Sequence, residues 1–147
     1  MSDNIPDAWR TVGPQLEGEP GAEVLVVGGD AGPNSIGLYA AGLAFPITVD
    51  ASGSPDGLRC ALNSTAFDGT CTSPSVYLAD PELPLFSMYS RCCTFHTGRA
   101  HVRPAIPVVL ALVAAGFDPS LVTTAVVNRD EVVAAFAAPS MKVVISL

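Results

Sequence analysis

The chain has 147 residues, of which 49% are hydrophobic and only 14% are charged, and its formal net charge is −7. This acidic balance argues against nucleic acid and anionic membranes as partners, because both require basic surfaces. No apolar run approaches the roughly 20 residues of a membrane span, and the first residues do not resemble a signal peptide, so we expect a cytoplasmic protein.

Hydrophobic periodicity and turn residues predict strands and helices that alternate along the chain. In order, we expect helix 7–16, strand 24–27, helix 35–44, strand 47–49, helix 57–66, strand 71–73 continuing weakly to 77, strand 90–95, helix 107–115, strand 122–127, helix 130–137 and strand 142–147. Residues 68–70 are expected to form a turn, and Gly116 to cap the helix before it. This alternation predicts an α/β fold with a mostly parallel sheet.

Residues 24–53 follow the order strand, glycine turn, helix, strand, with which a doubly wound sheet holds the phosphates of a dinucleotide. Gly28, Gly29 and Gly37 allow the backbone to approach a pyrophosphate at the start of the helix. Asp30, however, would repel phosphate. A tight strand-to-helix connection without any ligand is therefore an equal alternative.

Asp50 ends the second strand of this stretch, at roughly the separation expected of the acid that binds ribose hydroxyls. Spacing alone therefore assigns Asp50 to that role. S-adenosylmethionine is a weaker alternative ligand, because it has a ribose but no pyrophosphate and would tolerate Asp30.

Several segments, in collinear order, resemble the coenzyme-binding half of the medium-chain, zinc-type alcohol dehydrogenases. They are SDNIPDAWRTVGPQLEGEPGAEVLVVGG, SIGLYAAGLA, VDASGSPDGL, FHTGRAHVRPAIPVVLALVAAG and VTTAVV. The final piece, DPSLVTTAVVNRDEVVAAFAAPSMKVVISL, resembles the segment with which those enzymes return to their catalytic domain. The resemblance implies a shortened Rossmann-like domain over 1–116 and that returning segment over 117–147. It also implies NAD or NADP as coenzyme, with hydride transfer at a catalytic zinc.

The resemblance carries over to individual positions of this chain. It implies that Gly28, Gly29, Ile36 and Gly37 face the pyrophosphate, and that Ala51 and Ser52 lie near the nicotinamide ribose. Ser75 and Val76 are implied to lie against the nicotinamide, and Phe95, His96 and Thr97 near its carboxamide. Lys142 matches a further position near the coenzyme.

The zinc ligands of the family are almost entirely missing. Only Asp3 matches a ligand position, the third, and one carboxylate does not hold a catalytic zinc, which takes three protein ligands. His96 and His101 are expected to face solvent or to be hydrogen-bonded. The cysteines form no CxxC pair, and we expect Cys60, Cys71, Cys92 and Cys93 to be small buried hydrophobes, the last two on opposite faces of a strand.

The chain also departs from the family between its first two strands. VDASG is the fourth strand of the family, so the second and third strands are missing and Asp50 occupies the position of the acid by coincidence of spacing. We predict that VDASG takes the slot of the second strand, or that the connection is strained and its helix shortened.

Arg91, Arg99 and Arg103 make the loop near residue 97 locally cationic. These arginines would either attract a coenzyme phosphate or a carboxylate substrate, or form ion pairs with Asp80 or Glu82. We favour the ion pairs. We expect an oxidoreductase lineage with residual or lost coenzyme binding and no catalysis by this chain alone. The alternative is a non-catalytic module or pseudoenzyme remnant that self-associates through a sheet edge or binds a missing catalytic domain.

Overall fold

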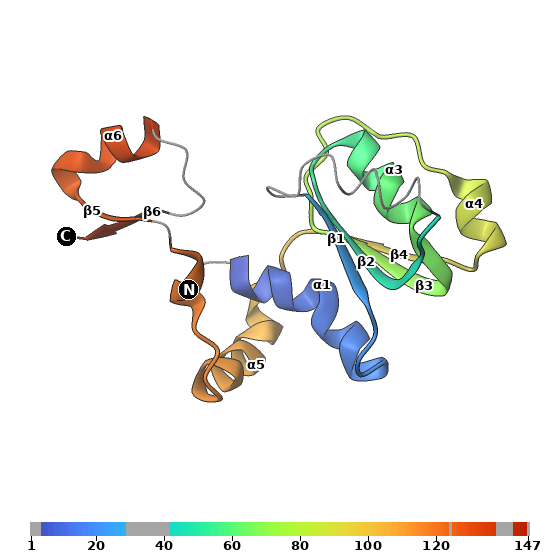
Figure 1. Cartoon of the computed structure of the whole chain (residues 1–147), viewed down its shortest axis with the longest axis horizontal. Coiled ribbons are helices and arrows are strands. Elements are labelled where there is room, and N and C mark those ends of the chain that lie inside the picture. The colour runs from blue at the N-terminus through green and yellow to red at the C-terminus, as the bar shows by residue number, and fades with distance from the viewer. Residues whose placement is uncertain (1–3, 29–41, 124, 138–142, 147) are drawn as a thin grey trace. The chain divides into compact units, whose positions relative to one another are not determined.

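A computed structural model describes residues 4–28, 42–123, 125–137 and 143–146. The chain divides into two compact units, residues 1–106 and 107–147. The elements are α1 (Asn4–Gly18), β1 (Val24–Gly28), β2 (Phe45–Ala51), α3 (Pro55–Asn63), β3 (Thr65–Ser73), α4 (Leu85–Ser90), β4 (Thr94–Thr97), α5 (Val102–Ala114), η1 (Pro119–Val122), β5 (Ala125–Asn128), η2 (Arg129–Glu131), α6 (Val132–Ala137) and β6 (Val143–Ser146) (Figure 1).

The first unit is built around a four-stranded parallel sheet in the order β1-β2-β3-β4 (Figure 1). Val24 pairs with Ile47, Thr48 with Cys71, and Cys71 with Phe95. The predicted fold class is confirmed: the domain is α/β, with a shortened Rossmann-like parallel sheet and flanking helices. Because all four strands run the same way, their carboxyl ends meet at one edge.

Strand β2 is covered on both faces. Leu25, Val27 and Cys71 form a buried cluster with Leu58 and Leu62 of α3. Ile47 and Val49 are not part of that cluster, yet they are only 1% and 3% exposed. Because α1 contacts β2 and β3 as α3 does, helices protect both sides of the central strands.

Two predicted boundaries around β3 are wrong. The helix predicted to reach residue 66 ends at Asn63, and β3 begins at Thr65, so the turn predicted at 68–70 lies inside the strand. Asp68 has a φ of 57° there, and the pairing of β2 with β3 shifts register between Phe45 and Ile47. A bulge of unpaired residues therefore gives the sequence DGT the appearance of a turn, and pairing with β2 resumes at Thr70.

The strand predicted over 90–95 is also wrong. Its place is taken by α4, a tight turn and β4, which begins only at Thr94. Cys92 and Cys93 lie in that turn and not on opposite faces of a strand, and Cys92 is exposed. The expectation of buried cysteines is confirmed for Cys60 and Cys71.

Most of the helix predicted over 35–44 lies outside the described residues, although residues 42–44 are not helical. Strand β2 pairs in parallel with β1. The path between them runs through residues 29–41, so the predicted slot of VDASG and the strain of its connection remain predictions.

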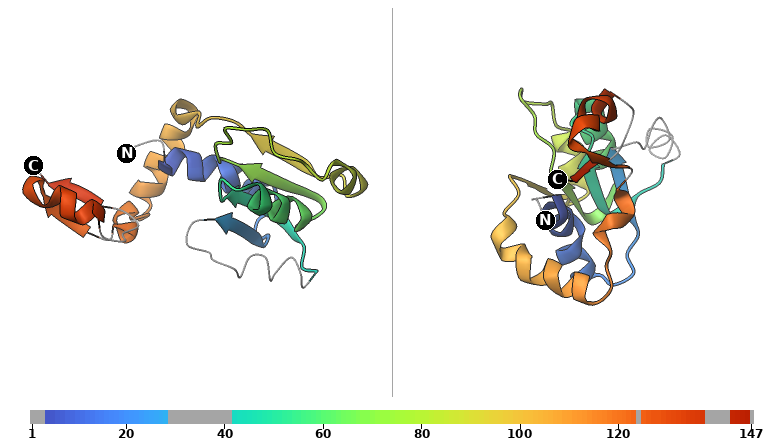
Figure 2. Two further views of the ribbon diagram at one scale, coloured as in Figure 1. Left: turned by 90° about the horizontal axis from the view of Figure 1, so that it is seen from above. Right: turned by 90° about the vertical axis from the view of Figure 1, so that its left-hand side faces the viewer.

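The second unit contains a parallel pair, β5 and β6, in which Ala125 pairs with Val143 and Asn128 with Ser146. Helix α6 contacts both strands and lies beside them in each view of Figure 2. The strands and helix predicted here are confirmed with shifted ends. Helix α5 starts at Val102 and not at 107, and Gly116, with a φ of 104°, follows its end as expected. No described helix is long and apolar enough to span a membrane.

Candidate functional site

The carboxyl ends of β1 to β4 meet at one edge of the sheet, where open α/β sheets bind their ligands. Gly28, Ala51, Ser73 and Thr97 are the last residues of these strands. The loops that follow bring most of the described residues of the predicted site to this edge. Gly29, Ile36, Gly37, Asp3 and Lys142, which were also predicted, lie outside the described residues.

Gly28 is required by the packing of the sheet itself. Its φ is 127°, and a Cβ atom on it would overlap the backbone of Ala51 and Ser52. Only glycine accommodates both this conformation and this close approach. The first glycine of the predicted turn therefore has a structural role that needs no ligand.

Asp50 is completely buried, and its carboxylate is surrounded by donors. Oδ1 accepts hydrogen bonds from the Ser52 amide at 3.1 Å and the Ser52 hydroxyl at 2.5 Å. Oδ2 accepts from Ser73 at 2.7 Å and from the Tyr77 phenol at 2.6 Å. These four bonds occupy the carboxylate, so the assignment of Asp50 from spacing as the ribose acid is wrong.

Tyr77 was not predicted as part of this edge, although the sequence places it at the weak end of a predicted strand. Its hydroxyl lies 2.6 Å from Asp50 and 3.2 Å from the Ser54 carbonyl oxygen. Burial, together with the bond to the Asp50 carboxylate and its negative charge, raises the pKa of Tyr77 to about 12. Tyr77 therefore remains a neutral donor at physiological pH and anchors the loop after β3 to β2.

The hydroxyls of Ser52 and Ser75 are also used within the fold. Ser52 Oγ donates to Asp50 and accepts from the Ser54 amide at 3.1 Å. Ser75 Oγ accepts from the Gly53 amide and donates to the Asp50 carbonyl oxygen, each at 3.1 Å. These bonds link the loops after β2 and β3.

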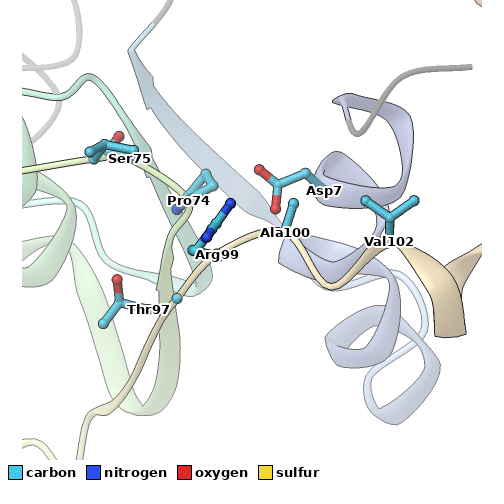
Figure 3. A pocket seen from close by; sticks show the side chains of 9 residues that line it. Asp7, Pro74, Ser75, Thr97, Arg99, Ala100 and Val102 are labelled. Atoms are coloured by element: carbon cyan, nitrogen blue, oxygen red, sulfur yellow. The ribbon is translucent and has the colours of Figure 1, made fainter.

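A cavity of about 540 Å³ lies between α1 and the loops after β3 and β4 (Figure 3). Its lining residues are Asp7, Pro74, Ser75, Val76, Thr97, Gly98, Arg99, Ala100 and Val102. The volume is within the range of small-molecule sites, roughly 300–1,000 Å³. Three residues predicted from the resemblance, Ser75, Val76 and Thr97, therefore share one cavity.

Helix α1 is tied to the loop that closes this cavity. Arg10 is hydrogen-bonded to Asp7, and its Nη2 donates to the Gly98 carbonyl oxygen at 2.6 Å. Figure 3 shows the side chains of Asp7 and Arg99 extending into the cavity from opposite sides. Neither Asp7 nor Arg10 was predicted to belong to the site, although their i, i+3 spacing on a predicted helix signals an ion pair.

A second cavity, of about 410 Å³, lies beside the first unit's α3. Its lining comprises Leu58, Ser73, Ser75, Tyr77, Asp80, Pro81, Leu83, Phe95 and Thr97. Ser75 and Thr97 line both cavities, so the two lie next to each other along the ends of β3 and β4.

Arg91 has neither of the roles considered for it. Its Nη1 donates to the carbonyl oxygens of Asn63 at 2.6 Å and Thr65 at 2.7 Å, and its Nη2 donates to Ser87 Oγ at 2.6 Å. The guanidinium thus fastens the end of α3 to α4 and pairs with neither predicted acid. Among the described residues Arg10 and Asp7 form an ion pair and the three arginines form none, so their predicted pairing with Asp80 or Glu82 is wrong.

The other candidate side chains are exposed. Arg99 and Arg103 are both exposed, and of these two Arg99 lines the first cavity. His96 and Ala51 are exposed and line neither cavity described above.

The described residues do not provide a catalytic zinc site. No group of three or more His, Cys, Asp or Glu side chains among them is placed to hold a metal ion, whereas catalytic zinc takes three protein ligands. The buried thiols are poor ligands as well, because burial raises the pKa of Cys60, and that of Cys71 to about 12.

No family model and no curated protein matches this chain. Solved structures do match. An alcohol dehydrogenase from Thermus sp. ATN1 is 19% identical, with a TM-score of 0.79 over 98% of this chain and 56% of that one. Zinc dependent alcohol dehydrogenase 2 from Streptococcus pneumonia is 15% identical, with a TM-score of 0.72 over 92% of this chain and 52% of that one. A short chain alcohol dehydrogenase from Escherichia coli CFT073, complexed with the cofactor NADH, is 12% identical, with a TM-score of 0.70 over 99% of this chain and 49% of that one.

The chain therefore spans about half the length of these matched structures. At such low identity the likeness concerns the fold. The resemblance to zinc-type alcohol dehydrogenases inferred from the sequence is confirmed at that level.

Proposed function

We propose that this chain binds the nicotinamide end of NAD or NADP in the cavity between α1 and the loops after β3 and β4. It is the coenzyme-binding part of an alcohol dehydrogenase-like fold and does not catalyse the reaction alone. The bound coenzyme would accept or donate a hydride, whereas this chain's residues would hold and orient the ring.

The observation that carries the proposal is the place of the cavity. It opens at the carboxyl ends of parallel strands, and its lining includes Ser75, Val76 and Thr97, which the sequence resemblance had assigned to the nicotinamide. Val76, Ala100 and Val102 offer apolar contacts for a ring. Because the Ser75 hydroxyl is occupied, Thr97 is the better side-chain candidate for hydrogen bonding.

Without a zinc site in the described part of the chain, we expect no alcohol oxidation by the isolated protein. Purified protein supplied with zinc, NAD and a panel of primary and secondary alcohols should give no increase in absorbance at the NADH wavelength. Stoichiometric bound zinc together with turnover would contradict the proposal.

Binding is tested by titrating NADH and following its fluorescence. We expect saturable binding with a Kd below about 1 mM. Val76→Trp should fill the cavity and weaken binding at least about tenfold. Leu78→Trp is the matched control, since residue 78 lies in the same segment, is 99% exposed and does not line the cavity. No fluorescence change up to about 1 mM NADH would contradict coenzyme binding.

A second candidate function is self-association. In the described sheet β4 is an edge strand, and Phe86 and Tyr89 of the preceding α4 are each 83% exposed. Exposed strand edges and apolar patches favour pairing with another chain. Sedimentation over a range of protein concentrations should detect oligomers, and Phe86→Asp should reduce them. A monomer at every concentration would exclude this function.

A further inference from the structure

The charges in the first cavity favour an anionic ligand. Asp7 and Arg99 are the charged side chains of its lining, and Asp7 is paired with Arg10. Arg99 makes no ion pair in the described part of the chain, and its guanidinium points into the cavity (Figure 3). The cavity thus offers an uncompensated cation in a chain whose net charge is −7. A guanidinium in this position suits a phosphate.

At the same edge of the sheet, the described residues offer no binding groups for the adenosine half of a dinucleotide. Dinucleotide sites of this class hold the adenine-side ribose with an acid at the end of the second strand. Asp50, to which spacing alone gives that role, is buried, and its carboxylate accepts hydrogen bonds from Ser52, Ser73 and Tyr77. Among the described residues, moreover, no strand lies beyond β1, where an adenosine would rest against the sheet.

The described residues thus offer contacts to the nicotinamide half of a dinucleotide and none to its adenylate half. From them we propose that this chain is a mononucleotide binder: it takes a nicotinamide ribose monophosphate in the cavity, with Arg99 on the phosphate, and the adenylate half of NAD adds no affinity. This inference rests on the proposed function, because it assigns the ligand class of the same cavity.

Calorimetric titration of the full chain with reduced nicotinamide mononucleotide, NADH and AMP tests this assignment. We expect Kd values for the first two that agree within about threefold, whereas AMP, which is the adenylate half alone, should displace neither. Arg99→Gln should weaken both nucleotides about tenfold and leave reduced nicotinamide riboside, which has no phosphate, unchanged. Arg59→Gln is the matched control, because Arg59 is an exposed arginine of α3 that lines neither cavity.

The outcomes separate the two proposals. If NADH binds more than about threefold tighter than the mononucleotide, the mononucleotide assignment is overturned and the proposed function stands. If no nicotinamide compound binds, both are overturned. If Arg99→Gln weakens the riboside as much as the nucleotides, Arg99 does not hold the phosphate. Thermal melting of each variant shows whether a lost affinity reflects a lost fold.

Discussion

Asp50 shows how a single buried carboxylate can organise the functional edge of a sheet. It is fully buried, and it receives hydrogen bonds from the loop after β2, from the end of β3 and from the loop after β3. A buried charge is tolerated only when such donors replace water. The Asp50 carboxylate, which the sequence suggests as a ligand contact, therefore forms internal hydrogen bonds that position the loops around both cavities.

Burial of the Tyr77 phenol, together with its bond to Asp50, makes the free energy of unfolding decrease at alkaline pH. The raised pKa of Tyr77, about 12 in the native state against 10.0 as its ordinary value, means that the folded protein retains a proton that the unfolded chain loses. The stabilisation is complete below pH 10 and is lost as pH rises towards 12. Urea unfolding between pH 8 and pH 11 should show this decline, with a part due to Cys71, whose pKa is also raised to about 12.

Tyr77→Phe should remove the part of the alkaline loss of stability that is due to the Tyr77 phenol. At neutral pH the variant should lose about 1.5–3 kcal/mol of unfolding free energy, because a donor to a buried carboxylate is lost. Tyr89→Phe, at an exposed position of α4, should behave as wild type. An unchanged stability of Tyr77→Phe would mean that the phenol does not anchor this loop.

Cys92 occupies a position that glycine usually fills. Its φ is 54°, and it follows α4 in a Schellman arrangement: the Cys93 amide donates to Met88 O at 3.0 Å and the Cys92 amide to Tyr89 O at 3.2 Å. Left-handed backbone costs a non-glycine residue about 1 kcal/mol. Cys92→Gly should therefore raise the unfolding free energy by about that amount in urea denaturation. Tyr89→Gly, within the helix, should lower it, and a destabilised Cys92→Gly would contradict the argument.

At the scale of elements, Arg91 joins α3 and α4 to the bulge in β3. Its guanidinium bonds carbonyl oxygens at the end of α3, and its own carbonyl oxygen accepts from the Asp68 amide at 2.8 Å. The arginine thereby satisfies carbonyl groups that a helix end leaves open. The bulge and the turn before β4 consequently support each other.

Arg91→Ala should destabilise the first unit by about 2 kcal/mol, because charge-assisted bonds to partly buried carbonyls are lost. Arg59→Ala, which removes an exposed arginine from α3 itself, is the control and should change stability by less than about 0.5 kcal/mol. Chemical denaturation of the two variants checks the difference. Equal stabilities would mean that Arg91 contributes no more than a surface charge.

The sequence predicted elements well where periodicity alone determines them and poorly where tertiary contacts decide. The strand from Val24 and the helix of α3 follow from apolar spacing. Residues 68–70 resemble a turn, and only the pairing that resumes with β2 at Thr70 shows that the strand continues through them. Helix α4 is six residues long and has no buried residue, so it leaves no apolar stripe in the sequence.

The site was predictable to a similar degree. The resemblance located the edge and three residues of one cavity. It could not show that the Ser52 hydroxyl donates to the Asp50 carboxylate. Nor could it show that the Ser75 hydroxyl links the Gly53 amide to the Asp50 carbonyl oxygen. Nor could it bring Asp7 to the cavity or Arg10 to the loop after β4, because both residues precede the first strand and meet these parts only in the fold.

At the scale of the whole molecule, the two units differ in how their strands are protected. Strand β2 has a hydrogen-bonded neighbour on each side and is buried, whereas β5 and β6 have only each other among the described residues. Val126 of β5 and Phe136 of α6 are 67% and 68% exposed. A two-stranded sheet with so much open apolar surface is marginal in water.

Amide hydrogen exchange should therefore separate the units. Amides of residues 47–49 and 70–72 should open only with global unfolding, and those of Ala125–Asn128 and Val143–Ser146 should exchange on the order of 100-fold faster, by local unfolding. Equal protection of both sets at low concentration would contradict this difference. Repeating the measurement at rising protein concentration extends the test: if protection of β5 and β6 increases, a second copy covers their apolar side chains. A constant ratio would instead mean that the second unit opens independently of other copies.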